Sequence, residues 1–149
     1  MQAVRGDFMK VIERHVAVLR ASGLAPTLVR APTEDDPVGV VSFAAPDRLY
    51  AVFSDEREPR FVRVTTGMGF NRSNAPDPAV LLHLANDCNQ SFRFVRTVVQ
   101  TPVRVEFVFE AMVEDSERLP DVIEAAVPAL SRVADNFFDR MYLPDSAQA

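Results

Sequence analysis

Residues 81–113, LLHLANDCNQSFRFVRTVVQTPVRVEFVFEAMV, pass from the hydrophobic period of a helix to that of two strands. Up to position 89, apolar residues recur three and four positions apart, as on the buried face of a helix; they are Leu81, Leu84, Ala85 and Cys88. Two apolar-rich runs follow, at 92–99 and 103–113, and a short turn that contains proline joins them. In the second run apolar and charged residues alternate, which predicts a strand with one buried face and one wet face.

Two asparagines, Asn86 and Asn89, lie where this helix is expected to end and the next strand to begin. Asparagine tolerates the left-handed backbone conformation, and its amide can bond nearby backbone groups. We therefore interpret both residues as a structural motif. A ligand-binding role would need polar partners from other elements, and the sequence identifies none.

The chain before this stretch predicts a helix and then a meander of strands. Apolar residues over 3–21 form one helical stripe that includes Val4 and Phe8, and Gly23 suits a left-handed cap after it. Beyond it the period changes to that of strands, with turn residues between four runs: 27–31, 38–44, 49–54 and 60–68. Such short connections favour antiparallel pairing.

Alternation also assigns faces to the fourth of these runs. Val62, Val64 and Met68 are expected to point into the core. Arg63 and Thr65, which alternate with them, are expected to face water.

The two later helices have recognisable sequence signals. Asp77 can cap free amides and Pro78 is tolerated in a first turn, so a helix is expected to begin there. A continuous apolar stripe predicts the last helix over 120–142. Pro128 removes one backbone hydrogen bond inside that stripe, so we expect a kink or a break near 124–128.

The resulting order, α-β-β-β(-β)-α-β-β-α, predicts an α+β protein with an antiparallel sheet and helices packed on one face. A chain of 149 residues without an evident linker is expected to form a single domain. We place that domain at 1–143 and expect 144–149 to be a frayed tail.

The stretches 85–89 (ANDCN) and 92–94 (FRF), followed by the apolar strand at 105–113 and the amphipathic helix at 119–142, resemble the YbjN family. Its members are described as bacterial sensory-transduction regulators with a type III secretion chaperone-like fold. The resemblance implies a role in protein–protein interaction, a dimer, and the binding of an extended segment of a partner. Members often carry a large side chain where Cys88 stands, so Phe92 or Phe94 is expected to fill that volume.

Composition limits the other classes of function. The net charge of −5 and the pI of about 5.0 disfavour binding to nucleic acid or to an anionic membrane. The longest apolar runs are too short to span a bilayer, and no signal peptide is evident, so we expect a cytoplasmic protein. The single cysteine, Cys88, excludes an internal disulfide and is expected to be a buried, inert thiol.

The sequence contains no recognisable catalytic, cofactor-binding or metal-binding motif. His15 and His83 lack the paired spacing of a zinc site, and we interpret both as ordinary side chains. Glu106 and Glu110 alternate with buried residues and are expected on the wet face, where a raised pKa is not expected. We therefore predict a protein that is not an enzyme and has no cofactor.

Several arginines fall in the predicted strands, and they allow two interpretations. In the first, they pair across strands with Glu106 and Glu110. In the second, they form a basic strip that binds an acidic peptide. The candidate partner-binding residues are Arg63, Arg93, Arg96 and Arg104, with Arg60 beside them.

The leading hypothesis is a non-enzymatic protein-interaction module, a homodimer with a chaperone-like or regulatory role. The late strands or the last helix are expected to supply the dimer contact, because four aromatic residues provide apolar surface there: Phe107, Phe109, Phe137 and Phe138. The alternative is a small-molecule-binding or catalytic α+β domain with its site between the sheet and the last helix. In that case 70–72 (FNR) would line the entrance.

Overall fold

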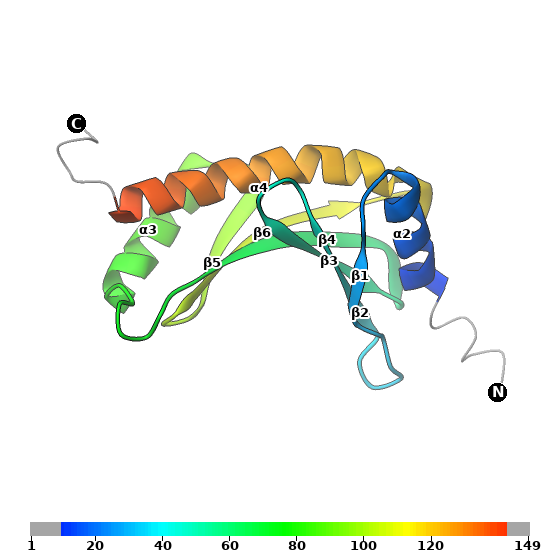
Figure 1. Cartoon of the computed structure of the whole chain (residues 1–149), viewed down its shortest axis with the longest axis horizontal. Helices are drawn as coiled ribbons and strands as arrows, with labels where there is room; N and C mark the ends of the chain where they lie inside the picture. The colour runs from blue at the N-terminus through cyan, green and yellow to red at the C-terminus, as the bar shows by residue number, and fades with distance from the viewer. Residues whose placement is uncertain (1–9, 143–149) are drawn as a thin grey trace. The chain divides into compact units, whose positions relative to one another are not determined.

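The computed structural model describes residues 10–142 and shows an α+β protein with its elements in the predicted order (Figure 1). Six strands form an antiparallel sheet in the order β1-β2-β3-β4-β6-β5. The elements are α2 (Lys10–Ala21), β1 (Thr27–Arg30), β2 (Val38–Ala44), β3 (Leu49–Asp55), β4 (Glu58–Gly69), α3 (Pro78–Ser91), β5 (Val95–Thr101), β6 (Arg104–Met112), the 3-10 turn η1 (Ser116–Arg118) and α4 (Leu119–Tyr142). The predicted fold class is confirmed. The tail predicted at 144–149 lies outside the described residues, as do Val4 and Phe8 of the predicted first stripe.

The described residues group into two compact units. The first comprises 10–64 and 110–127, and the second comprises 65–109 and 128–142. Strands β4 and β6 and helix α4 each contribute residues to both units. The single domain over 1–143 stays a prediction.

In the first unit, α2 is amphipathic and ends as the sequence predicted. Leu19 is buried, and Gly23 has φ of +87°. The Leu24 N–H donates to the Leu19 carbonyl at 3.1 Å, and the Gly23 N–H donates to the Arg20 carbonyl at 3.0 Å. This pair of bonds is a Schellman motif, which needs a residue such as glycine in the left-handed conformation. The cap at Gly23 is confirmed.

Close packing of α2 on the sheet depends on a glycine in β2. A Cβ at Gly39 would collide with the Ile12 Cδ1 atom of α2. Behind this contact, β2 and β3 pair in register, with Val41 opposite Val52 and both side chains buried. Helix α2 therefore packs closely on β2 because Gly39 has no side chain.

Strand β4 corrects one assignment of faces. Val62 and Val64 are buried as predicted, but Thr65 is only 3% exposed instead of facing water. Thr66 is equally buried. Because successive strand residues point to opposite faces, both faces of β4 are covered at this position. Alternation in the sequence cannot reveal a strand that is covered on both sides.

In the second unit, α3 begins as predicted and runs further than predicted. The Asp77 Oδ1 atom accepts a hydrogen bond from the Ala79 N–H at 2.8 Å, and Pro78 occupies the first turn. The helix continues to Ser91, so Asn86 and Asn89 lie inside it instead of at its end. Neither asparagine adopts the left-handed conformation. Among the described residues other than glycine, positive φ occurs at Phe94.

The core of the second unit includes two aromatic residues that the sequence assigned to a dimer contact. The rings of Phe107 and Phe137 meet edge-to-face with centroids 5.6 Å apart, and both side chains are fully buried. This arrangement adds to the burial energy of the pair. The prediction that these two residues supply a dimer surface is wrong. Phe138 is half exposed, and Phe109 is intermediate.

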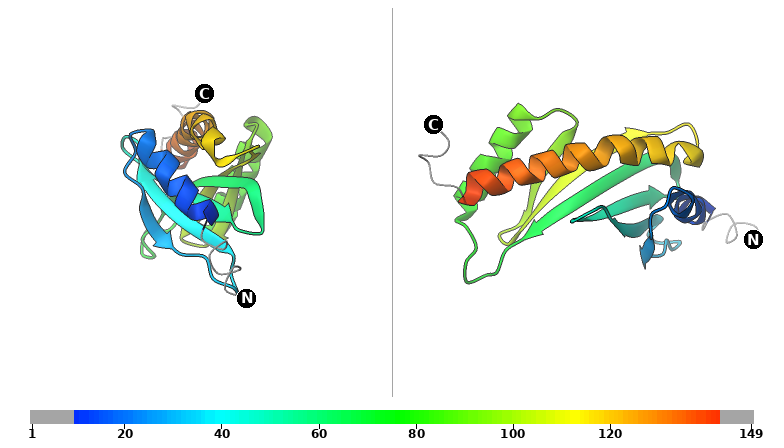
Figure 2. Two further views of the ribbon diagram at one scale, coloured as in Figure 1. Left: turned by 90° about the vertical axis from the view of Figure 1, so that its right-hand side faces the viewer. Right: turned by 45° about the horizontal axis from the view of Figure 1, so that its top comes forward.

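Helix α4 is a single helix of 24 residues that contains Pro128, so the predicted break is wrong and the alternative, a kink, stays a prediction (Figure 2). Pro128 is exposed, and so is Glu124, whose carbonyl loses its helical partner. A carbonyl on the exposed side of a helix can be hydrated, which lowers the cost of the missing bond. The proline is therefore tolerated without ending the helix.

Candidate protein-interaction site

Arg63, the first candidate for partner binding, is occupied by contacts within the first unit. Its Nε and Nη2 atoms contact Glu110 Oε1 at 3.0 and 2.9 Å. Its guanidinium also lies 5.9 Å from the ring centroid of Phe53 and 5.8 Å from that of Phe61. Arg63 therefore pairs with Glu110 across strands, as in the first of the two interpretations. Glu106 differs, because its carboxylate accepts a hydrogen bond from the Gln100 amide and not from an arginine.

The other three candidate arginines belong to the second unit, and all are exposed. Arg96 lies in β5, and Arg104 begins β6 with its guanidinium over Gly67, where an added Cβ would lie 2.6 Å from Nη2. Arg93 was predicted to lie in a strand, but it lies in the connection between α3 and β5 because α3 extends to Ser91. Arg93 therefore lies outside the strands, whereas Arg96 and Arg104 lie in strands as predicted.

Arg93 lines a small pocket in the second unit, which we call the Phe94 pocket. It has a volume of about 290 Å³ and is lined by the α3–β5 connection and by α4: Ser91, Phe92, Arg93, Phe94, Val95, Ala129, Arg132 and Val133. Val95 and Val133 are buried, whereas Arg93 and Arg132 are exposed. Within residues 10–142, neither guanidinium group has a hydrogen bond or an ion pair. Arg132 was not among the predicted residues, because a charged residue on an amphipathic helix looks like part of any solvated face.

Phe94 combines an unusual backbone with an unusual exposure. Its φ is +69°, in the left-handed region that bulky residues rarely adopt. Its side chain is 83% exposed. The expectation that Phe94 fills the volume beside Cys88 is therefore wrong. Strained backbone of this kind costs about 1 to 3 kcal/mol and tends to occur at functional sites.

Asn89 holds the start of β5 against α3 through two hydrogen bonds. Its Oδ1 atom accepts from the Thr97 N–H at 2.7 Å, and its Nδ2 atom donates to the Thr97 carbonyl at 3.0 Å. Strand β5 is at the edge of the sheet, so the Asn89 amide replaces the peptide group that a further strand would offer. Asn86 is exposed as well, but within residues 10–142 its side chain makes no such bonds. The two asparagines of the predicted motif thus have different environments.

In the first unit, His15 of α2 is fully buried and lies within hydrogen-bonding distance of Ser54 Oγ through Nδ1. Burial, assisted by the positive charge of Arg14, lowers the pKa of His15 to about 4, so the ring is neutral near pH 7. Its Nε2 atom has no partner among the described residues. His83 is exposed and faces Asp87 at 3.4 Å on the same helix.

Glu56 completes the attachment of α2. Its carboxylate oxygens accept hydrogen bonds from the Val11 and Ile12 N–H groups, each at 3.2 Å. Free N–H groups at the start of a helix are often satisfied by an acceptor of this kind. Burial raises the pKa of Glu56, although the two backbone hydrogen bonds oppose that change. Glu56 lies between the predicted strands at 49–54 and 60–68, and that position does not indicate this role.

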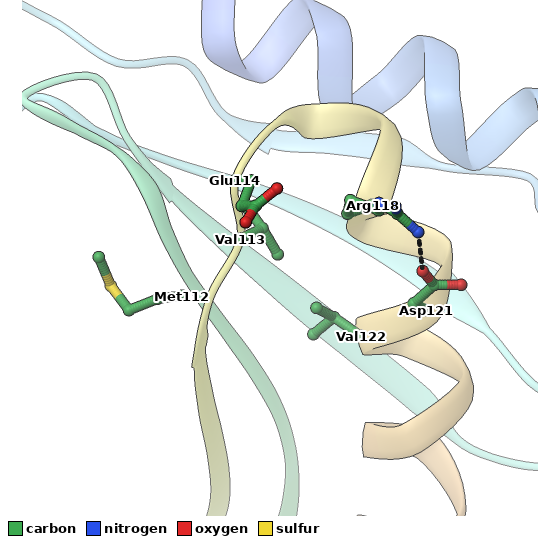
Figure 3. A pocket seen from close by; sticks show the side chains of 6 residues that line it. All are labelled: Met112, Val113, Glu114, Arg118, Asp121 and Val122. Carbon is green, nitrogen blue, oxygen red and sulfur yellow. Dashed lines mark hydrogen bonds and ion pairs between the residues drawn. The ribbon is translucent and has the colours of Figure 1, made fainter.

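A second pocket, of about 350 Å³, lies in the first unit between the end of β6 and the start of α4 (Figure 3). Arg118 and Asp121 on its rim pair with each other at 3.4 Å. This location resembles the site expected in the alternative hypothesis, but residues 70–72 do not line it. Asn71 instead accepts a hydrogen bond from the Ser73 N–H within its own loop.

Residues 10–142 also bear on metal binding and membrane insertion. No group of three or more His, Cys, Asp or Glu side chains in this range is placed to hold a metal ion. The helices in the same range include none with the length and apolar character needed to cross a bilayer. Cys88 is buried in α3, and desolvation by burial raises the pKa of its thiol.

The comparisons with known proteins support the fold. No family model and no curated protein matches the chain. Among solved structures, the chain is similar to an uncharacterized protein from Methanothermobacter thermautotrophicus, with a TM-score of 0.58 and 14% sequence identity. The similarity covers 87% of this chain and 98% of the other. At this identity the similarity shows the fold alone.

Proposed function

We propose that this chain is a non-enzymatic protein-interaction module with a chaperone-like or regulatory role in the cytoplasm. The observation that carries the proposal is Phe94, a strained and exposed aromatic side chain beside two arginines that have no partner within residues 10–142. Exposed aromatic residues and arginines are enriched in the parts of interfaces that contribute most binding energy. The resemblance of residues 85–89 and 92–94 to the YbjN family supports the same class of function.

The test is chemical crosslinking of the tagged chain in its native cell, followed by quantitative mass spectrometry. The proposal expects one or a few proteins enriched over a tag-only control and lost when Phe94 is replaced by alanine. It would be abandoned if no protein were enriched reproducibly.

We also propose that the chain acts as a homodimer. The exposed Phe138 and Tyr142 rings, with centroids 4.6 Å apart at the end of α4, provide apolar surface that a second copy can cover. Light scattering is expected to give about twice the chain mass of 16.6 kDa. A mass that stays at that of one chain at all concentrations would contradict the dimer.

The second candidate function is small-molecule binding at the pocket of Figure 3. The pocket volume of about 350 Å³ falls within the usual range for ligand sites. A thermal-shift screen against metabolite classes tests it, because a bound ligand raises the melting temperature. Val122→Trp, which would fill this pocket, should then abolish the shift, whereas substitutions at Phe94 should not.

A further inference from the structure

We propose that the Phe94 pocket binds an acidic peptide segment that carries one apolar anchor side chain. This inference rests on the proposed function and adds the chemistry of the partner. The four features that carry it are the charge of the pocket, its apolar floor, the conformation of Phe94 and the attachment of the α3–β5 connection.

The charge of the pocket selects acidic ligands. Arg93 and Arg132 lie on one pocket, both are exposed, and neither has an ion-pair partner in the part of the chain that the structure describes. The chain as a whole has a net charge of −5, so two adjacent arginines without acids bound to them are a local exception. Guanidinium groups bind carboxylates with two parallel hydrogen bonds, which gives both attraction and orientation.

The floor of the pocket selects an apolar side chain. Val95 is 4% exposed and Val133 is 2% exposed, and both line the pocket. Its volume of about 290 Å³ is at the lower end of the range of about 300–1,000 Å³ that encloses small-molecule ligands. One large apolar residue of a peptide fits this size better than a cofactor does. Anchor residues seated in a pocket of this kind commonly dominate an interface.

The conformation of Phe94 indicates that the exposed ring is not an accident of packing. A glycine at this position would adopt φ of +69° without strain, yet the chain has phenylalanine there. The ring makes the rim of the pocket and is 83% exposed. A residue with a strained backbone and an exposed side chain contributes little to folding. The contribution of Phe94 is therefore expected in a complex.

The connection that presents Phe94 is fixed at both ends. On one side, the Phe92 N–H donates to the Cys88 carbonyl at 2.9 Å and closes α3. On the other side, Asn89 bonds both backbone groups of Thr97 in β5. A connection fixed in this way loses little conformational freedom on binding, and such preorganisation favours affinity.

A peptide is favoured over nucleic acid for two reasons. The pI of about 5.0 opposes the approach of a polyanion, since electrostatic attraction to phosphates dominates binding of that kind. The pocket also has a single exposed aromatic ring, whereas binding to single strands uses several rings on which successive bases stack. Nucleic acid is therefore an outcome that the experiment must separate.

The experiment uses the full chain, immobilised, to select from a displayed library of random peptides. Selected peptides are then synthesised with a fluorescent label, and their affinities are measured by anisotropy. We expect enrichment of peptides in which Asp or Glu residues flank one Phe, Leu or Met. Replacing the acids of a selected peptide by Asn and Gln, or its apolar residue by Ala, should weaken binding at least about tenfold, which is about 1.4 kcal/mol.

Variants of the protein locate the binding. Arg93→Glu combined with Arg132→Glu should weaken binding at least about tenfold, and the wild-type affinity should fall as salt is added. The matched control is Arg72→Glu, which reverses another exposed arginine of the second unit that does not line the pocket. Its affinity should remain within about twofold of wild type, because salt screens a surface charge that does not line the pocket.

Phe94→Gly provides the most specific signature. The substitution relieves the left-handed strain, so the melting temperature should rise, while peptide affinity should fall at least about fivefold through loss of the aromatic rim. A merely structural Phe94 would give the opposite pattern, with lower stability and unchanged affinity.

Three results would overturn the inference: selected peptides without acids, equal binding by the Arg93→Glu/Arg132→Glu variant, or tighter binding of a labelled oligothymidylate than of any selected peptide. Failure to enrich any peptide would overturn it as well. The crosslinking experiment keeps the two proposals apart. If it recovers a protein partner that the Arg93→Glu/Arg132→Glu variant retains, the protein-interaction function stands and the acidic-peptide site does not.

Discussion

Helices α2 and α3 are both attached to strands by polar side chains, but the attachments differ in chemistry. In the first unit, α2 is held by buried His15 against Ser54 and by the Glu56 carboxylate at its N-terminus. In the second unit, α3 is held by the neutral amide of Asn89 on the backbone of Thr97. One attachment uses ionisable groups, and the other does not.

Because of this difference, the attachment of α2 should depend on pH, and the attachment of α3 should not. A buried imidazole must stay neutral for α2 to remain packed, since charging it without a partner is costly. An amide bonded to a backbone N–H and carbonyl has no such condition. Acid is therefore expected to loosen the first unit before the second, and three predictions test the comparison.

The largest expected effect comes from His15. Its pKa is about 4 in the folded chain and about 6.5 when exposed, so between these values the unfolded chain binds a proton that the folded chain does not. Stability therefore falls as pH falls from about 6.5, by about 2 kcal/mol at about pH 5. Urea unfolding across this range measures the loss, and hydrogen exchange should show faster opening of α2 than of α3.

His15→Leu is the control, because leucine cannot titrate and the pH-dependent loss should shrink by that amount. Glu56 acts in the opposite direction. Its raised pKa gives a contribution that is present below its ordinary value of 4.5 and is lost as pH rises through the folded value. A wild-type profile that matches His15→Leu throughout would refute the role of the histidine.

The next effect tests the neutral attachment. Asn89→Ala leaves the Thr97 N–H and carbonyl without their partner, and we expect a loss of about 1 to 2 kcal/mol in the free energy of unfolding. Exchange protection should fall at Thr97, and the loss should not vary between about pH 7 and pH 5. Asn86→Ala is the matched control, since Asn86 is an exposed asparagine of the same helix and should change stability by less than about 0.5 kcal/mol.

The smallest effect concerns the surface ion pair of the first unit. A double-mutant cycle of Arg63→Ala and Glu110→Ala should give a coupling of about 0.2 to 1 kcal/mol, because both groups are partly exposed and salt screens them. Arg63→Ala also removes the contacts with Phe53 and Phe61, and the cycle separates these from the ion pair. A coupling of zero would show that the ion pair adds nothing to stability.

Local sequence patterns predicted the elements well where the cause is local. The cap at Gly23, the start at Asp77 and the strand at 38–44 depend on turn chemistry and on alternation within a few residues. The end of α3 was placed too early because asparagine at 86 and 89 was expected to terminate a helix. Its actual role at Asn89 depends on a strand that begins several residues later.

The candidate site was only partly predictable. Arg93 was identified, but its neighbour Arg132 is far away in sequence and joins it only in the folded chain. The left-handed conformation of Phe94 has no sequence signal, because phenylalanine ordinarily avoids it. Likewise, His15 is buried beside Ser54 of β3, and the spacing of residues in α2 does not reveal that partner.

The buried thiol of Cys88 has a practical consequence. Because this is the chain's lone cysteine and it has no exposed surface, an alkylating or disulfide reagent can reach it only when α3 separates from its surroundings. The rate of labelling in native buffer then reports the rate of that opening, with no introduced probe. A partner that holds α3 in place would slow the labelling, so complex formation can be followed through this single sulfur atom.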